Sequence, residues 1–172
     1  MHHWLIPVAQ IASPICAAIG VIIAVWNAQK SIRATTENAQ RSGEGSRKIA
    51  QRRATLDLIV LEQTNSKLFK KRREFLRLRQ EGDLIRWASP ENAASEAVSH
   101  ISAVMNKYEM VALGIENEAL CEIVYKDWLK TTFVKDWVEL QGYVYELRRR
   151  HNNPHLYERF ERLAKKWQGE NC

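Results

Sequence analysis

The first hydrophobic stretch of the chain runs from Trp4 to Trp26 and contains no charged residue. A helix of about 20 apolar residues covers the roughly 30 Å hydrocarbon core of a bilayer. A cleaved signal peptide fits less well, because its apolar region is usually shorter and follows a basic segment, whereas this chain begins with Met1-His2-His3. Pro7 and Pro14 argue against a buried soluble helix, since interior prolines are better tolerated within membranes. The pattern therefore predicts an uncleaved single transmembrane helix within residues 1–27.

Basic residues flank this stretch on one side only. No Lys or Arg precedes it, and those that follow it closely are Lys30, Arg33, Arg41, Arg47, Lys48, Arg52 and Arg53. Because basic flanks are retained in the cytoplasm, we expect the C-terminal side there and the N-terminus outside. Trp4 and Trp26 stand at the two ends, where indole rings favour the headgroup region.

Residues 28–47 are polar and carry no apolar stripe, so we interpret them as a juxtamembrane linker or an extension of the first helix. Their first part has no proline or glycine and can remain helical. The run Ser42-Gly43-Glu44-Gly45 is the expected break.

From residue 48 to residue 172 the apolar positions recur at spacings of three and four, as in amphipathic helices. The clearest helix is expected to begin at Ser89-Pro90-Glu91 and to stop at Gly114. The patch Thr131-Thr132-Phe133 is strand-like but too short to found a sheet. Further helices are predicted over residues 47–64, 67–80, 116–129, 134–150 and 153–169. The sequence thus predicts an all-α protein, with a transmembrane helix followed by a cytosolic bundle of five or six helices.

The formal net charge of +6 is concentrated towards the N-terminal half. Residues 1–54 carry 7 basic and 2 acidic groups, whereas residues 89–172 carry 11 basic and 13 acidic groups. This distribution favours anionic membrane lipids as a partner over a dedicated nucleic-acid domain, whose basic face would continue into the folded part. Nucleic acid stays open as an alternative partner.

The chain shows no phosphate-binding loop, dinucleotide-binding glycine motif, nucleophile elbow or zinc-protease motif. Its three cysteines have no paired spacing, and His151 and His155 straddle a predicted helix start. The acidic residues of the second half fall at mixed helical phases, as on a solvated face. We therefore predict no catalytic residue, cofactor or metal site, and a protein that is not an enzyme.

Two charged features qualify as candidate contacts. The cluster Lys70, Lys71, Arg72 and Arg73 is dense enough to bind the phosphates of lipids or nucleic acid, although consecutive residues point around most of a helix. Glu109 lies beside the apolar stripe of the clearest helix, and we expect a structural ion pair between it and Arg148.

Small residues recur at every fourth position of the apolar stretch, a spacing that lets two membrane helices approach closely. We name these positions as a candidate self-association face: Ala12, Cys16, Gly20 and Ala24.

The cytosolic part resembles a bacterial family described as a domain of unknown function, DUF4760. The likeness covers roughly residues 48–168 and is carried by helix-packing patterns. These are Arg52–Leu58, Asn106–Glu109, Val111–Ile115, Tyr125–Trp128, Val134–Trp137, and Tyr157–Glu161 with Leu163 and Trp167. Similar members are typically small bacterial or prophage-encoded proteins with an N-terminal membrane helix. The resemblance implies an anchored helical domain and supplies no activity.

Together these features predict a membrane-tethered, non-enzymatic interaction or regulatory protein, phage- or defence-related, at the cytoplasmic face of the bacterial inner membrane. The expected partners are membrane lipids, a protein not identified from the sequence, and further copies of the chain. Two alternatives stay open: a membrane-anchored nucleic-acid-binding protein or nuclease-type effector, and an oligomeric protein that permeabilises the membrane.

Overall fold

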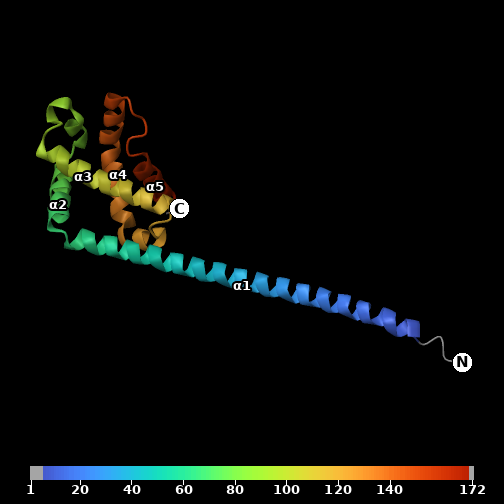
Figure 1. Ribbon diagram of the computed structural model, residues 1–172. Coiled ribbons are helices and arrows are strands. Elements are labelled where there is room, and N and C mark those ends of the chain that lie inside the picture. The colour runs from blue at the N-terminus through green and yellow to red at the C-terminus, as the bar shows by residue number, and fades with distance from the viewer. Residues whose placement is uncertain (1–5, 171–172) are drawn as a thin grey trace. The chain divides into compact units, whose positions relative to one another are not determined.

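The computed structural model describes the backbone of residues 6–170, and the side chains of residues 26–170 apart from 28, 32, 34 and 37–39. Every regular element in this part of the chain is helical, which confirms the all-α prediction there (Figure 1). The elements are α1 (Ile6–Thr64), α2 (Ser66–Glu81), the 3-10 helices η1 (Leu84–Ala88) and η2 (Pro90–Asn92), α3 (Glu96–Glu116), α4 (Glu122–His151) and α5 (Glu158–Gly169). The chain divides into two units, residues 1–47 and residues 48–172.

None of the helices has, within the residues described, a segment long and apolar enough to cross a membrane. The apolar stretch on which the predicted anchor depends lies almost wholly outside the residues whose side chains the structure describes, which begin at residue 26. The candidate self-association face lies outside them as well, namely Ala12, Cys16, Gly20 and Ala24. Both therefore stay predictions.

The helix break expected at Ser42–Gly45 is absent, because α1 continues through these residues. Of the described glycines, only Gly82 has a positive φ, of 76°, and it ends α2. A glycine within a helix costs about 1 kcal/mol relative to alanine, which is too little to break a helix flanked by good helix formers. Gly43 and Gly45 therefore weaken α1 locally without interrupting it.

We expect alanine at both Gly43 and Gly45 to stabilise α1. A methyl group at either position would meet nothing within 4 Å, so each replacement should contribute about 0.5–1 kcal/mol of helix stability. Hydrogen exchange of the amides of residues 40–50 in the full-length chain should slow accordingly. Unchanged or faster exchange in the double variant would contradict this account of α1.

Gly114→Ala is the opposite case. Its Cβ would lie 2.7 Å from Cδ1 of Leu120, so this variant should destabilise the bundle by about 1–3 kcal/mol.

Helix α1 ends at Thr64, and the chain turns a corner at Asn65, between the helices predicted over residues 47–64 and 67–80. Asn65 is extended, with φ −78° and ψ 103°. Its side-chain oxygen accepts hydrogen bonds from the backbone N–H groups of Lys67 at 3.0 Å and Leu68 at 3.1 Å. These bonds satisfy two amides that the first turn of α2 would otherwise leave unpaired. The chain thereby ends one helix and starts another within a single residue.

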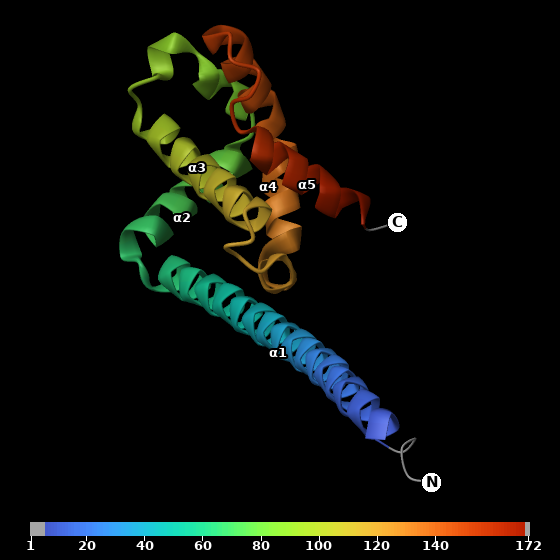
Figure 2. The same ribbon diagram turned by 45° about the vertical axis from the view of Figure 1, so that its right-hand side comes forward.

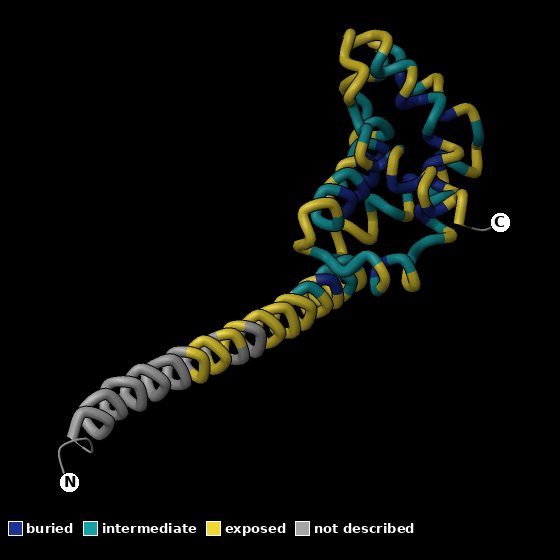
Figure 3. The backbone as a smooth tube through the Cα atoms, turned by 90° about the vertical axis from the view of Figure 1, so that its right-hand side faces the viewer, coloured by how far each residue is buried: buried dark blue, intermediate teal, exposed yellow. Residues whose placement is uncertain are grey.

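Helices α2 to α5 form the bundle of the second unit, in which α3 packs against α2 and α5, and α4 packs against α5 and η1. Figure 2 shows α3, α4 and α5 side by side. The buried residues lie where these helices face one another, as Figure 3 shows in dark blue. The centre of the core is aromatic: Tyr108, Phe133, Trp137, Phe160 and Trp167 are at most 1% exposed and contact one another edge-on or tilted. The bundle is therefore built around ring packing.

Several predicted helix boundaries are wrong. The helix expected from Ser89 begins at Glu96 instead, because the side chain of Ser95 accepts from the amide of Val98 and Pro90 starts only a short 3-10 turn. The two helices expected over 116–129 and 134–150 are one helix, α4, which begins at Glu122. The last helix begins at Glu158 and not at Asn153-Pro154.

The strand-like patch Thr131-Thr132-Phe133 lies in the middle of α4. Phe133 is fully buried, and its ring contacts Tyr108 at 4.6 Å and Trp167 at 4.7 Å between centroids. Packing of this ring offsets the weak helix propensity of two neighbouring threonines.

Candidate binding site

The bundle buries a carboxylate at the junction of three helices. Asp136 of α4 is completely buried. Its Oδ2 lies 2.5 Å from Nη1 of Arg72 and accepts a hydrogen bond of 2.7 Å from the Tyr108 hydroxyl, while its Oδ1 accepts from Arg79. Arg72 and Arg79 belong to α2 and Tyr108 to α3. A charge in the interior is tolerated only when its partners are this close. The four side chains thus tie α2, α3 and α4 together.

The Tyr108 hydroxyl acts here as a donor. Burial, and secondly the nearby carboxylate of Asp136, raise the pKa of Tyr108 well above its ordinary value. The phenol is therefore held protonated, which is the form that can donate to Asp136.

A second polar cluster fixes the end of α1 on the bundle. Glu62 accepts from Nζ of Lys107 at 3.2 Å and from the hydroxyl of Tyr125 at 3.2 Å. Two turns earlier, the completely buried Thr55 accepts from the amide of Cys121 at 2.8 Å. Burial lowers the pKa of Lys107, although Glu62 opposes this effect. Residues 55–62 are therefore held by directed hydrogen bonds as well as by apolar packing.

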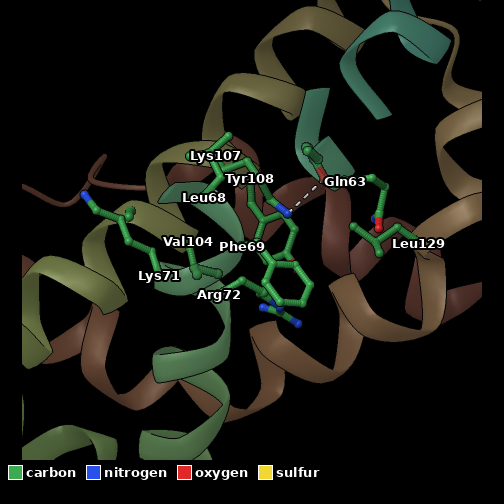
Figure 4. Close-up of a pocket in the computed structure, with 11 residues that line it drawn as sticks. Gln63, Leu68, Phe69, Lys71, Arg72, Val104, Lys107, Tyr108 and Leu129 are labelled. Atoms are coloured by element: carbon green, nitrogen blue, oxygen red, sulfur yellow. Dashed lines mark hydrogen bonds and ion pairs between the residues drawn. The ribbon is translucent and has the colours of Figure 1, made fainter. Parts of the chain in front are cut away.

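A cavity of about 150 Å³ lies between these two clusters, at the corner formed by α1 and α2. Its apolar wall consists of Leu68, Phe69, Val104 and Leu129, and its polar wall includes Glu62, Arg72 and Lys107. In Figure 4 the ring of Phe69 and the polar ends of Arg72 and Lys107 occupy the same region, whereas the amino group of Lys71 points away. Phe69 is 57% exposed, unusually much for a phenylalanine. The cavity at this corner therefore has an exposed aromatic side chain at its rim.

The predicted phosphate-binding cluster is divided by the fold. Lys70 and Arg73 are exposed on α2, Lys71 is half-buried, and Arg72 turns inward to Asp136. One turn of helix therefore presents two of the four cations outward, beside Phe69. The expectation that four consecutive residues make no single face agrees with this arrangement.

The predicted ion pair between Glu109 and Arg148 is wrong, since each residue has a different partner on α5. Glu109 accepts from the backbone amide of Phe160 at 2.8 Å and contacts Arg159 at 3.5 Å. Arg148 lies 2.6 Å from Glu161 and donates to the carbonyl of Leu156 at 2.9 Å. Both residues tie helices together, as expected of a structural role, but through α5. The sequence alone did not reveal this because the start of α5 was misplaced by about one turn.

Glu161 gives α5 a pH-dependent attachment. Burial alone would raise its pKa, but hydrogen bonds from Lys165, Arg148 and Tyr145 outweigh that effect and lower the pKa from 4.5 to about 2. Because the folded pKa is the lower one, the stabilisation is complete above pH 4.5 and is lost as the pH falls towards 2.

We therefore expect the free energy of unfolding to fall between pH 4.5 and 2, and Glu161→Gln to remove about 1–2 kcal/mol of that fall. Urea unfolding of the full-length chain in detergent at several pH values measures this. Equal slopes for the two proteins would contradict the assignment. Glu96→Gln, at an 81% exposed carboxyl, is the matched control and should leave the slope unchanged.

A second, wider groove of about 830 Å³ lies between the η1–η2 segment, α3 and the end of α4. Trp87, Tyr143 and Tyr157 contribute aromatic side chains to it, and Arg150 contributes a charge. Nε of Arg150 already donates to Glu146 at 2.6 Å. Arg150 is the one Lys, Arg, Asp or Glu among the residues that line this groove, whereas several charged residues line the corner cavity. The corner cavity is therefore the better candidate for a binding site.

Metal ligation finds no support in the residues described, among which no three His, Cys, Asp or Glu side chains converge. Nδ1 of His155 lies 2.8 Å from Glu158, and His151 is exposed at the end of α4.

The sequence analysis missed Glu62 and Lys107, which line the cavity, and Arg79 and Asp136, which belong to the buried cluster beside it. Asp136 was placed among scattered surface acids, although it directly precedes the buried Trp137. The available signal for a buried carboxylate was an aspartate directly beside a tryptophan in a predicted helix. The signal for its partners was the pair Arg72 and Arg79, which lie two turns apart on another predicted helix.

A family model described as "Domain of unknown function (DUF4760)" matches residues 14–167 of the chain. No curated protein and no solved structure matches it.

Proposed function

The chain belongs to the DUF4760 family, and we propose that it is a membrane-tethered interaction protein that binds a protein partner at the corner between α1 and α2. The apolar stretch from Trp4 to Trp26 anchors it in the inner membrane of a bacterium, and the basic flank keeps the bundle in the cytoplasm. The protein acts as a binding module without catalytic chemistry.

The observation that carries this proposal is the exposed Phe69 at the rim of a cavity with an apolar wall. Burying a phenylalanine side chain releases about 1.5–3 kcal/mol, so a partner that covers this ring gains substantially. The cavity beside it accepts one apolar side chain of the partner against Leu68, Val104 and Leu129. This is the arrangement of an anchor residue in a pocket.

The charged residues at the rim of the cavity define the chemistry of the partner. Lys70 and Arg73 are exposed one turn apart, next to Phe69 and Gln63 around a shallow depression on the same corner. Exposed cations at a rim favour partners with acidic residues and speed their association. We therefore propose an acidic protein segment that carries an apolar side chain.

The buried charged groups support binding over catalysis. Both oxygens of Asp136 and both oxygens of Glu62 are engaged with neighbouring side chains. A general acid or base must have an oxygen that the substrate can reach, whereas the oxygens of these carboxylates are already hydrogen-bonded or ion-paired within the bundle. The two carboxylates therefore hold the helices that form the cavity and its rim.

A nucleic-acid partner is the second candidate, because Lys67, Lys70 and Arg73 are all exposed and lie three residues apart along α2. Such a stripe can follow a phosphate backbone. A nucleic-acid partner accounts for less of the surface than a protein partner does, because it gives the exposed Phe69 and its cavity no role beyond base stacking.

Photo-cross-linking in growing cells tests the proposal. A benzoylphenylalanine at position 69 of the full-length chain should form a discrete protein adduct, and the same group at Ile85, which is 53% exposed elsewhere on the bundle, should not. The peptides attached at position 69 should be rich in Asp and Glu. Lys70→Glu combined with Arg73→Glu should reduce the adduct about tenfold or more, since two rim charges are reversed. Equal adducts at both positions, or an adduct at position 69 that nuclease removes, would contradict the proposal.

A further inference from the structure

Helix α1 has a second face, apart from the face that packs on the bundle. Thr55 and Ile59 face the bundle, whereas Ile49, Leu56 and Val60 are 69%, 53% and 58% exposed. Successive residues of a helix are about 100° apart, so Leu56 lies roughly a quarter of a turn from the packed Thr55. Single exposed aliphatic residues are ordinary, but three on one face of one helix indicate a surface that is covered in use.

The positions of this face follow a heptad pattern. Ile49, Arg53, Leu56 and Val60 are separated by four, three and four residues. An alternation of three and four places residues along the seam of a two-stranded coiled coil. Leu61 is also 51% exposed, but it lies about 140° away from Leu56 around the helix and outside this seam.

We infer that this face binds the same face of a second copy of the chain, as a short parallel coiled coil over residues 49–60. The aliphatic residues at 49, 56 and 60 would each meet their own counterpart on the second copy. Three residue layers give a small interface, so the pairing needs the two chains to be held close together.

Charges beside the seam fit a second copy in this orientation. In a parallel pair, the residue that precedes one seam position lies beside the residue five positions later on the other helix. Arg52 and Asp57 are five residues apart, flank the seam and are both exposed. Each arginine would therefore face the aspartate of the other chain, twice by symmetry. An antiparallel pair would not bring these two positions together in this way.

Arg53 lies on the seam itself, where it meets Arg53 of the second copy. A charged residue at such a position lowers the stability of a coiled coil but restricts its register and the number of strands. The pairing is therefore weak by itself. Its parallel orientation rests on the proposed anchor, because two chains that enter the membrane from the same side run in the same direction and have a raised local concentration.

Disulfide cross-linking of the full-length chain in native membranes tests this inference. In a chain whose native cysteines are replaced by serine, a single cysteine at Ile49 or Leu56 should give a disulfide-linked dimer on mild oxidation. The control cysteines are Ala54→Cys and Leu61→Cys, which are exposed on other faces and should give about tenfold less dimer, equivalent to about 1.4 kcal/mol. Equal yields at all four positions, or none at any, would overturn the inference.

Substitutions on the seam give a second test with opposite signs. In the Ile49→Cys background, Arg53→Leu should raise the dimer yield and Leu56→Asp should lower it, whereas Leu61→Asp should leave it unchanged. A yield that Arg53→Leu leaves unchanged or lowers would contradict the seam. The same gels report pairing whether or not the chain is anchored, so they distinguish a failed anchor from a failed seam. Orientation is tested in cells that produce an Arg53→Cys chain together with a Leu56→Cys chain. A disulfide between these two chains would show an antiparallel pair and overturn the parallel one.

Discussion

Replacing Asp136 by alanine is expected to lower the free energy of unfolding by about 3–5 kcal/mol, because it leaves Arg72 and Arg79 together in the interior without their shared carboxylate. The Tyr108 hydroxyl loses its acceptor as well. Removing one member of a buried charged cluster costs more than the cluster contributes, since the remaining charges stay desolvated. Urea unfolding of the full-length chain in detergent measures the loss, and Asp127→Ala, at an exposed acid of the same helix, is the matched control.

A second variant separates the charge effect from the loss of packing. With Asp136→Leu, Arg72→Met and Arg79→Met combined, no charge of the cluster remains and the volumes are roughly kept. This variant should recover most of the stability that the alanine variant loses. If the single Asp136→Ala variant is as stable as the unmodified chain, the cluster does not hold α2, α3 and α4 together as described.

Trp167→Ala should have an effect of similar size, about 3–5 kcal/mol. Trp167 is fully buried, its ring lies 4.7 Å from that of Phe133, and its Nε1 donates to Glu122 at 2.8 Å. Deleting it opens a cavity at the centre of the aromatic core and leaves a carboxylate of α4 without this donor. Because α5 is short and attached mainly by this face, its amides should exchange hydrogen faster than those of α3.

Trp128→Ala is the control for this variant. Trp128 is 50% exposed on α4, so its loss should cost less than about 1 kcal/mol. Equal losses for the two tryptophans, or unchanged exchange in α5, would contradict the account of the core.

The parts of the fold that could be predicted from the sequence are those where local and global signals agree. The stripe of α3, from Ile101 to Ala112, and that of α5, from Phe160 to Trp167, are buried as the spacing predicts. The corner at Asn65 and the end of α2 at Gly82 follow directly from residue chemistry. Such positions need no knowledge of the rest of the chain.

The misread parts are those where packing overrides local preference. Ile123 and Trp128 are apolar positions of the helix predicted over residues 116–129. They are nevertheless 68% and 50% exposed, because α4 turns Tyr125 and Leu129 inward instead. Glycines at 43 and 45 suggested a break, yet α1 continues. The apolar pattern of one helix cannot show which of two neighbouring faces packs against other helices. That face depends on where the other helices lie.

The candidate site was the least predictable part. Its polar wall comes from α1, α2 and α3, through residues that are 45 positions apart in the case of Glu62 and Lys107. The cluster Lys70 to Arg73 was recognised as charged, but only the fold shows that Arg72 serves the interior while Lys70 and Arg73 remain outside. Long-range pairing of this kind leaves no local signal.

The tether and its orientation are the central claim, since they decide which compartment the corner at Asn65 meets. Single-cysteine variants of the full-length chain, labelled in intact cells with a membrane-impermeant maleimide, test the claim most directly. We predict that a cysteine at His3 is labelled in cells with a permeabilised outer membrane, and that one at Ser46 is labelled only after the inner membrane is opened. Equal labelling of both positions before the inner membrane is opened, or release of the chain from membranes by alkaline carbonate, would contradict the account.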